Sequence, residues 1–312
     1  MKKEKVIVLR GPTASGKTEI SLKLAQIFPL EIISVDSVMV YKKLNIGSAK
    51  PTKDILEKHP HHLIDMCEPS DKYSVGRFIV DANKSIKQIH SLNKIPILVG
   101  GTMMYHKVLQ DGLSKLPPAD DKIRYELDLK AKSIGWPEMH KELKKVDPES
   151  ALNIKANDRQ RIQRGLEVFI ISGIPLSKLN KEQSKNTDYN FINISLIPDD
   201  RDALYKNIES RFDSMIKIGL YEEIRKLLDD GDVCKESHSM QSIGYREMVS
   251  LIQGKITKEE AINSAKQSSR RYAKRQITWL RSMDDQYKVK LSDTDMISTI
   301  KNIIYQHIEI ST

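Results

Sequence analysis

Cysteine is scarce in this chain of 312 residues, which contains only Cys67 and Cys234. The two lie far apart without ligand-like neighbours, so we expect neither a disulfide framework nor a zinc site, and a reducing cytoplasm is the natural setting. No apolar run approaches the roughly 18 residues of a membrane span, so we expect no membrane association. Residues 1–5 pass directly into an apolar run without a cleavage site, so we also expect no signal peptide.

Acidic residues are fewer than basic ones, 42 against 51, which gives a formal net charge of +9. An enzyme that acts on a small phosphate needs a few local cations rather than an overall basic charge. A basic excess indicates a polyanionic partner such as nucleic acid, provided that the charges are clustered. A generally lysine-rich composition is the alternative explanation.

Two glycines, Gly11 and Gly16, stand in a recognisable motif shortly after the apolar run Val6-Ile7-Val8-Leu9. The motif G-x-x-x-x-G-K-T follows, and it predicts a strand, a phosphate-binding loop and a helix that begins at Lys17. Lys17 would supply a mobile cation, and the Thr18 hydroxyl would ligate Mg²⁺. The helix is expected to bury one apolar face made of Ile20, Leu24, Ile27 and Phe28. The residues predicted to bind a diphosphate or triphosphate are Gly11, Pro12, Thr13, Ala14, Ser15, Gly16, Lys17 and Thr18.

The first third of the chain alternates strand and helix signals. Apolar runs at 31–35 and 95–99 enclose a helical pattern at 75–92, which predicts a parallel sheet with helices on both faces. Residues 117–188 are helical and highly charged, and a strand signal returns at 191–197. Helical patterns then cover 199–218, 221–229, 242–253 and 258–283.

The fold class predicted from this order is α/β. A P-loop NTPase-like parallel sheet forms the core, an all-helical domain is inserted into it, and the C-terminal region is helical. The predicted divisions are 1–116 for the first part of the core, 117–188 for the insertion, and 189–312 for the core continuation with its basic C-terminal helices.

Ligands bind at the carboxyl ends of parallel strands, and two further polar elements fall there. Asp36 follows the second strand and is predicted to hold Mg²⁺ through water or to act as a general base, with turn capping as the alternative. Gly100, Gly101 and Thr102 follow the third strand, where they would bring backbone close to a ligand or form an ordinary tight turn.

Basic residues cluster in two places. Along residues 270–281, five cations with interleaved aromatics suit a phosphate backbone, with Arg270, Lys274 and Arg281 on one helical stripe; a solvated face is the alternative. Residues 159–164 would form a phosphate lid, an RNA contact or a solvated face. His59, His61 and His62 are crowded, but Pro60 breaks the helical ligand spacing, so we expect no metal there.

Several segments together resemble one family, the bacterial tRNA dimethylallyltransferases. In order along the chain they are GPTASGKT at 11–18, Asp36-Ser37, IGSAKP at 46–51, HHLID at 61–65, VGGT at 99–102, NDRQR at 157–161, Arg211-Phe212, IGYR at 243–246 and KRQITWLR at 274–281. One departure is Met39, where many members carry Gln, which puts in doubt a polar contact from that position.

The resemblance implies that the loop at 11–18 holds the diphosphate of dimethylallyl diphosphate. The exocyclic amine of the adenosine 3′-adjacent to the anticodon in tRNA then attacks the allylic carbon. Asp36 would remove a proton, while Lys17, the loop amides, Mg²⁺ near Thr18 and Arg211 stabilise the leaving group; Thr102 also lines the site. A monomer that binds the anticodon stem-loop is expected.

The same resemblance predicts the tRNA contacts. These residues are Asp36, Ser37, Val38, Met39, Thr102, Arg124, Gln160, Arg161, Ile162, Gln163, Arg164, Met240, Gln241, Ser242, Ile243, Gly244, Tyr245, Arg246, Lys274, Arg275, Gln276, Ile277, Thr278, Trp279, Leu280 and Arg281.

Three rival functions share parts of these features. A P-loop small-molecule kinase would need the loop and a lid but no basic C-terminal helix. A prenyltransferase of free nucleotides would need neither basic patch. A nucleotide-regulated RNA-binding protein would not depend on Asp36.

Overall fold

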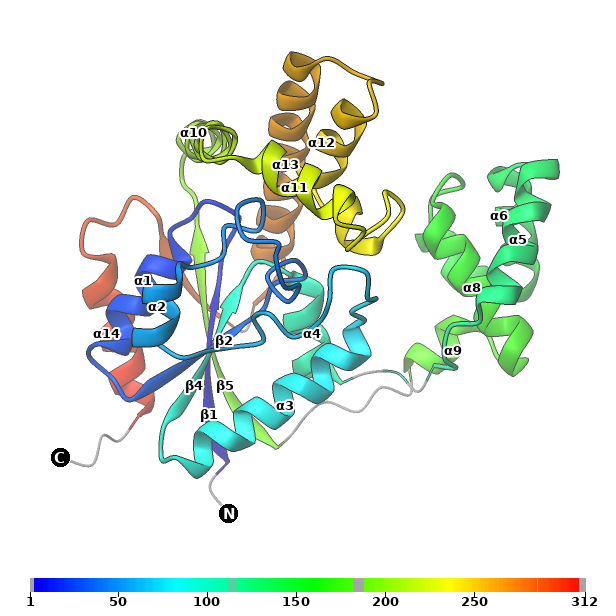
Figure 1. Cartoon of the computed structure of the whole chain (residues 1–312). Helices are drawn as coiled ribbons and strands as arrows, with labels where there is room; N and C mark the ends of the chain where they lie inside the picture. Colours follow the sequence, from blue (N-terminus) through cyan, green and yellow to red (C-terminus); the bar gives the residue numbers. More distant parts are fainter. Residues whose placement is uncertain (1–2, 113, 115, 182–187, 285, 309–312) are drawn as a thin grey trace. The chain divides into compact units, whose positions relative to one another are not determined.

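The computed structural model describes residues 3–112, 114, 116–181, 188–284 and 286–308 (Figure 1). The chain divides into two compact units, one of Met1–Val108 with Thr187–Thr312 and the other of Leu109–Asn186. The divisions predicted at 116/117 and 188/189 stay a prediction, and these compact units divide a few residues earlier. Within the described residues, no helix combines the length and the apolar composition needed to cross a bilayer.

The first unit is built on a six-stranded parallel sheet with the order β3-β2-β4-β1-β5-β6. Its strands are β1 (Glu4–Arg10), β2 (Leu30–Ser34), β3 (His61–His62), β4 (Ile95–Gly100), β5 (Tyr189–Ile197) and β6 (Tyr287–Lys290). Ile7 of β1 is paired with Ile97 of β4 and with Ile192 of β5, so β5 joins the sheet directly beside the first strand. The α/β class with a parallel sheet core is therefore confirmed.

Helices surround this sheet. They are α1 (Lys17–Ala25), α2 (Lys53–Lys58), α3 (Val75–Ser91), α4 (Met103–Asp111), α10 (Arg201–Lys217), α11 (Leu220–Asp229), η1 (His238–Gln241), α12 (Tyr245–Ile252), α13 (Lys258–Arg281) and α14 (Met296–His307). In Figure 1, α1 and α14 lie on one side of the sheet and α3 on the other. The predicted helices on both faces are thus present.

The second unit contains only helices among its described residues. They are α5 (Asp121–Ile134), α6 (Trp136–Val146), α7 (Pro148–Asn153), α8 (Arg159–Ser172) and α9 (Leu176–Lys181). The unit has a core of its own around Leu127, Met139, Leu143 and Ile162. Gly165 lets α8 approach α6, because a side chain there would meet Leu143.

Alternate residues of the strands supply a core on one face of the sheet. Ile7 and Leu9 face α1 and α14, where Leu24 and Ile304 pack in the same cluster. Ile20 and Phe28 are buried as predicted, but Ile27 is 42% exposed because α1 ends at Ala25 and the chain turns away. The predictions also missed β6 and α14. The run at 287–290 is too short to distinguish a strand from a loop.

The chain after Asp36 forms a long irregular segment that is held by polar cross-links. The Glu223 carboxylate accepts hydrogen bonds from the backbone N–H groups of Asn45 (2.9 Å), Ile46 (2.8 Å) and Gly47 (3.4 Å). It also accepts one from the Tyr245 hydroxyl at 2.8 Å. Gly47 has no room for a Cβ, because the Tyr245 ring lies 2.5 Å from that position. These contacts tie the IGSAKP segment to α11 and α12.

A second cross-link joins the IGSAKP segment to the HHLID segment. The Lys50 ammonium donates to the Tyr41 carbonyl oxygen at 2.9 Å and to Asp65 Oδ1 at 2.6 Å. The Lys50 side chain is only 4% exposed. Two of the sequence motifs therefore meet in one ion pair, in which Lys50 is buried and Asp65 is 43% exposed.

Replacing Glu223 by Ala should lower the free energy of unfolding by about 2–3 kcal/mol, because a charged acceptor of several hydrogen bonds is lost. The measurement is urea-induced unfolding. Glu222→Ala is the matched control, since Glu222 also lies in the first turn of α11 and shares the helix-dipole contribution. Equal losses in both variants would contradict the cross-link.

Candidate active site

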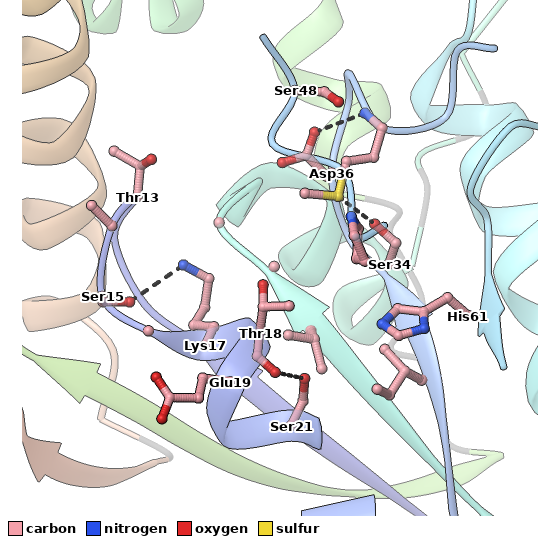
Figure 2. A pocket seen from close by; sticks show the side chains of 18 of the residues that line it. Thr13, Ser15, Lys17, Thr18, Glu19, Ser21, Ser34, Asp36, Ser48 and His61 are labelled. Carbon is pink, nitrogen blue, oxygen red and sulfur yellow. Dashed lines mark hydrogen bonds between the residues drawn. The ribbon is translucent and has the colours of Figure 1, made fainter. Parts of the chain in front are cut away.

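Three loops meet at the carboxyl edge of the sheet and line one cavity of about 330 Å³. The loop at 11–18 follows β1, Asp36 follows β2, and Gly100 ends β4 (Figure 2). Gly100 is required there, because a Cβ would collide with the Val35 carbonyl group. The sequence predictions for these three strand ends are therefore brought together in space.

The loop at 11–18 has the shape of an anion cradle. Gly16 adopts a left-handed conformation with φ +77°, and Ala14 does so with φ +60°. The helix α1 begins at Lys17, so its unpaired N-terminal amides face the cavity. The Lys17 ammonium donates to the Pro12 carbonyl oxygen at 2.6 Å. The Thr13 N–H already donates to Gln276 Oε1 at 2.9 Å, while Thr13 itself lines the cavity.

Two cations face this cavity. Burial, followed by the positive charge of Arg211, lowers the pKa of Lys17 to about 7, and Asp36 partly opposes this shift. Burial also lowers the pKa of Arg211, again opposed by Asp36. No described residue accepts a hydrogen bond from the Arg211 guanidinium, which lines the cavity. This pair of incompletely compensated cations favours binding of a multivalent anion.

Asp36 shows one of the roles that the sequence left open, the capping of its own turn. Its Oδ1 accepts hydrogen bonds from the backbone N–H groups of Val38 (2.8 Å) and Met39 (3.2 Å), which is the predicted turn capping. Among the residues that the structure describes, none donates to Oδ2. The carboxylate is thus oriented by its own turn and keeps one oxygen for a ligand (Figure 2).

A second cavity of about 350 Å³ adjoins the first. Asp36, Arg211 and Tyr272 line both. The second cavity also has apolar walls from Phe212, Met215 and Ile243, and the predicted residues Ser37, Val38, Gln241, Ser242 and Arg275 line it. Such a site has room for two ligands that meet at Asp36.

The helix α13 closes the site from the C-terminal part of the chain. Gln276 Nε2 donates to the Gly101 carbonyl oxygen at 2.8 Å, and the Tyr272 hydroxyl donates to the same oxygen at 3.3 Å. Burial, followed by the charge of Asp36, raises the pKa of Tyr272 to about 12, with Thr102 and Gln276 opposing. Thr102 therefore lies beside Tyr272, and Tyr272 belongs to the site although it was not among the predicted site residues.

The exposed face of α13 is basic. Lys274, Arg275 and Arg281 are exposed, and Trp279 is 37% exposed among them. Thr278 is also exposed. Arg270, predicted on the same stripe, instead forms an ion pair with Glu209.

Burial corrects several of the predicted tRNA contacts. Ile162, Met240, Tyr245, Ile277 and Leu280 are each at most 1% exposed, and Gln276 is 3% exposed, so these side chains pack inside the protein. Gly244 adopts φ +89° at the start of α12 and serves the turn. Arg246 pairs with Glu247 at 2.8 Å and stays partly exposed.

In the second unit, part of the predicted patch is structural. Arg124 and Arg164 both pair with Glu167, which is fully buried, at 2.9 and 2.6 Å. A buried carboxylate needs such partners, so these arginines stabilise the helical unit. Gln163 donates to Asp128 at 2.8 Å. Gln160 and Arg161 remain exposed.

The crowded histidines have partners of their own. His62 is hydrogen-bonded to Glu31 at 2.8 Å, and His61 Nδ1 to the His59 carbonyl oxygen at 2.6 Å. His61 also lines the first cavity. Within the described part of the chain, no three His, Cys, Asp or Glu side chains gather as metal ligands.

Met39 also lines the first cavity, where its thioether accepts a weak hydrogen bond from the Ser34 hydroxyl at 3.8 Å.

Sequence reasoning missed Ser34, Ser48 and His61 as lining residues, together with Phe212 and Met215. Ser48 and Phe212 lie in segments that carried the family resemblance. Residues 46–51 and 61–65 had no assigned role, and their cross-links could not be inferred from spacing.

Comparisons with known proteins agree with this geometry. The family model described as IPP transferase matches residues 39–283, and the one described as Isopentenyl transferase matches residues 4–68. The chain is 40% identical to tRNA dimethylallyltransferase 2 of Hahella chejuensis, over 97% of this chain and 96% of the relative. It is 45% identical to tRNA dimethylallyltransferase of Nitrosomonas eutropha, over 89% and 88%.

A solved structure has the same fold. The tRNA isopentenylpyrophosphate transferase of Bacillus halodurans superposes with a TM-score of 0.72 at 38% identity, covering 97% of this chain and 96% of that one. Relatives of this similarity, aligned almost from end to end, share more than the phosphate-binding loop. The chain therefore belongs to the tRNA dimethylallyltransferase family.

Proposed function

We propose that this protein transfers the dimethylallyl group of dimethylallyl diphosphate to the exocyclic amine of the adenosine 3′-adjacent to the anticodon in tRNA and releases diphosphate. One observation carries the proposal. Asp36 and Arg211 lie where an anion cradle adjoins a second, partly apolar cavity. The names of the relatives, which are tRNA dimethylallyltransferases, support the same substrates.

The diphosphate is proposed to bind in the loop at 11–18. The N-terminal amides of α1, Lys17 and Arg211 face it, and these groups stabilise the negative charge that builds up on the leaving oxygen. As the carbon–oxygen bond breaks, its electron pair goes to diphosphate. The bond between the amine nitrogen and the allylic carbon forms on the opposite side.

Asp36 is proposed as the general base. An exocyclic amine is a poor nucleophile, because its lone pair is delocalised into the purine ring. Removal of a proton by Asp36 Oδ2 as the new bond forms supplies roughly 10²–10⁴ in rate. Thr102, beside Tyr272, is proposed to orient the amine.

Mg²⁺ is the cofactor proposed for the cradle. Mg²⁺ is held in proteins through one or two oxygen ligands, with substrate phosphates and water completing its shell. Thr18 fits this requirement, because it lies on the first turn of α1 and lines the cavity. When bound there, the cation would neutralise charge on the diphosphate.

The tRNA is proposed to bind through the basic face of α13, with Lys274, Arg275 and Arg281 on phosphates and Trp279 available for stacking. Gln160 and Arg161 of the helical unit are proposed as further contacts. The adenosine must leave the loop stack to reach Asp36, at a cost of a few kcal/mol that backbone contacts offset. We propose further that the protein is a monomer and acts in the cytoplasm.

A P-loop kinase is the alternative, and the comparisons do not favour it. The direct test is incubation with labelled dimethylallyl diphosphate and tRNA, with ATP as a competing donor. Label should enter tRNA, and a tRNA with guanosine in place of that adenosine should remain unlabelled. Phosphoryl transfer from ATP without prenylation would contradict the proposal.

Replacing Asp36 by Asn should reduce the rate of prenyl transfer at least 10²-fold, because the amide cannot accept the proton. The tRNA affinity should stay within a few fold, since Asn Oδ1 still accepts from Val38 and Met39. Single-turnover kinetics and filter binding measure the two quantities. Asp54→Asn, the same change at an exposed position of α2, should leave the rate unchanged. A fully active Asp36→Asn enzyme would exclude the base assignment.

Binding of inorganic diphosphate should take up a proton above pH 7. Lys17 is largely neutral at pH 8 in the free protein, because its pKa is about 7. A bound anion raises that pKa, so uptake approaches about one proton at pH 8 and disappears below pH 6. Calorimetry in two buffers of different ionisation enthalpy measures it. Lys17→Met corrects for protons that diphosphate itself exchanges, and equal uptake by that variant would refute the assignment.

Replacing Lys274, Arg275 and Arg281 together by Ala should weaken tRNA binding and reduce the slope of log affinity against log salt by roughly 2–3. The control triple variant removes Lys58, Lys84 and Lys87, which are exposed on α2 and α3. Binding isotherms across a salt series measure both. An unchanged slope in the α13 variant would mean that this face does not contact RNA.

A further inference from the structure

We propose that Gln276 is a positioning residue that sets the separation between the loop that seats the leaving diphosphate and the loop that seats the attacking amine. The proposal rests on the function proposed above. Because Gln276 is buried, this positioning role replaces the RNA contact that the sequence predicted.

Gln276 makes one hydrogen bond to each of the two loops. Its Oε1 accepts from the Thr13 N–H at 2.9 Å, in the diphosphate loop. Its Nε2 donates to the Gly101 carbonyl oxygen at 2.8 Å, in the turn that ends at Thr102. The side chain is 3% exposed, so water does not replace either bond readily.

The glutamine amide satisfies both partners at once. Thr13 offers a donor and Gly101 an acceptor, so the bridging group must accept on one side and donate on the other. An ionised glutamate lacks the donor, and methionine of similar length lacks both. The fit is close, because a Cβ on Gly101 would collide with Gln276 Nε2.

The two hydrogen bonds of Gln276 would set the distance between the leaving diphosphate and the attacking amine. Thr13 and Ala14 line both cavities, and Gly101 lines the first. Tyr272 lies four residues before Gln276 on α13 and donates to the same Gly101 oxygen. One face of α13 therefore holds the loop that contains Gly101. Displacement of one loop relative to the other by about 1 Å would cost on the order of 10²-fold in the rate of transfer.

Substrate binding should survive loss of the bridge. The diphosphate loop keeps the Lys17 bond to Pro12 and the amides of α1. The exposed basic face of α13 lies apart from the buried Gln276 side chain. Loss of Gln276 should therefore lower kcat and leave KM for both substrates largely unchanged.

The first test compares Gln276→Met with Gln267→Met, the same change at an exposed position of α13. Single-turnover transfer should fall about 10²-fold in the first variant only, with diphosphate and tRNA affinities within a few fold of the parent enzyme. Circular dichroism and thermal unfolding show whether each variant is folded. A folded Gln276→Met enzyme with the parent kcat would overturn the proposal.

The second test uses protonation as a rescue. In Gln276→Glu, a protonated carboxyl donates to Gly101 and accepts from Thr13, as the amide does, whereas the carboxylate does not donate. The ratio of variant to parent kcat should therefore rise as pH falls. Glu19, Lys17, Asp36, His61, Arg211 and Tyr272 line the same cavity and occur in both enzymes, so their own titrations affect both rates.

A ratio that does not change with pH would mean that Gln276 only fills space, and the proposal would fail. Failure of the proposed function is a different result. In that case the parent enzyme itself would not transfer label from dimethylallyl diphosphate to tRNA, whatever residue stands at 276.

Discussion

The site depends on two cations that the fold holds in one cavity without a matching anion. The positive charges of Lys17 and Arg211 repel each other there, and the loss of water around them disfavours both charges. Asp36 compensates them only in part. Such an arrangement is unfavourable in the free protein, and the diphosphate proposed to bind there would supply the missing negative charge. The rest of the molecule keeps these three groups at their separation.

That separation is maintained from distant parts of the sequence. Asp36 is oriented by its own turn, and the segment that follows is fixed by Glu223 and by the pair of Lys50 with Asp65. Arg211 comes from α10, and α13 supplies Gln276 and Tyr272. Polar cross-links thus hold these segments, while the parallel sheet supplies the edge to which they attach.

The sequence predicted the fold well where local patterns are strong. The strand, loop and helix around residues 11–18 and the helix at α3 were predicted to within a few residues, because apolar period and glycine position decide them locally. The return of β5 to the sheet was predicted from a single apolar run. The strand β6 was not predicted, because four residues give too little pattern to distinguish a strand from a loop.

The site was predicted in outline and corrected in detail. Strand ends indicated that Asp36 and Gly100 lie beside the phosphate loop, since parallel strands share one edge. The segment at 274–281 resembles the family, but the resemblance does not show which face of the helix is buried. Gln276, Ile277 and Leu280 were therefore predicted to contact tRNA together with Lys274. The charges of Arg124 and Arg270 have protein partners that only folding brings near, in Glu167 and Glu209, whereas Arg164 pairs with Glu167 three residues along the same helix.

The bond between Thr13 and Gln276 spans 263 positions of the chain. During synthesis the amino-terminal loop emerges first, but its neighbour β5 follows only after the helical unit, and α13 emerges later still. A nascent chain therefore has the phosphate motif long before it has the groups that align it. A chain that stops before α13 would therefore present the phosphate motif without the hydrogen bond that ties Thr13 to Gln276.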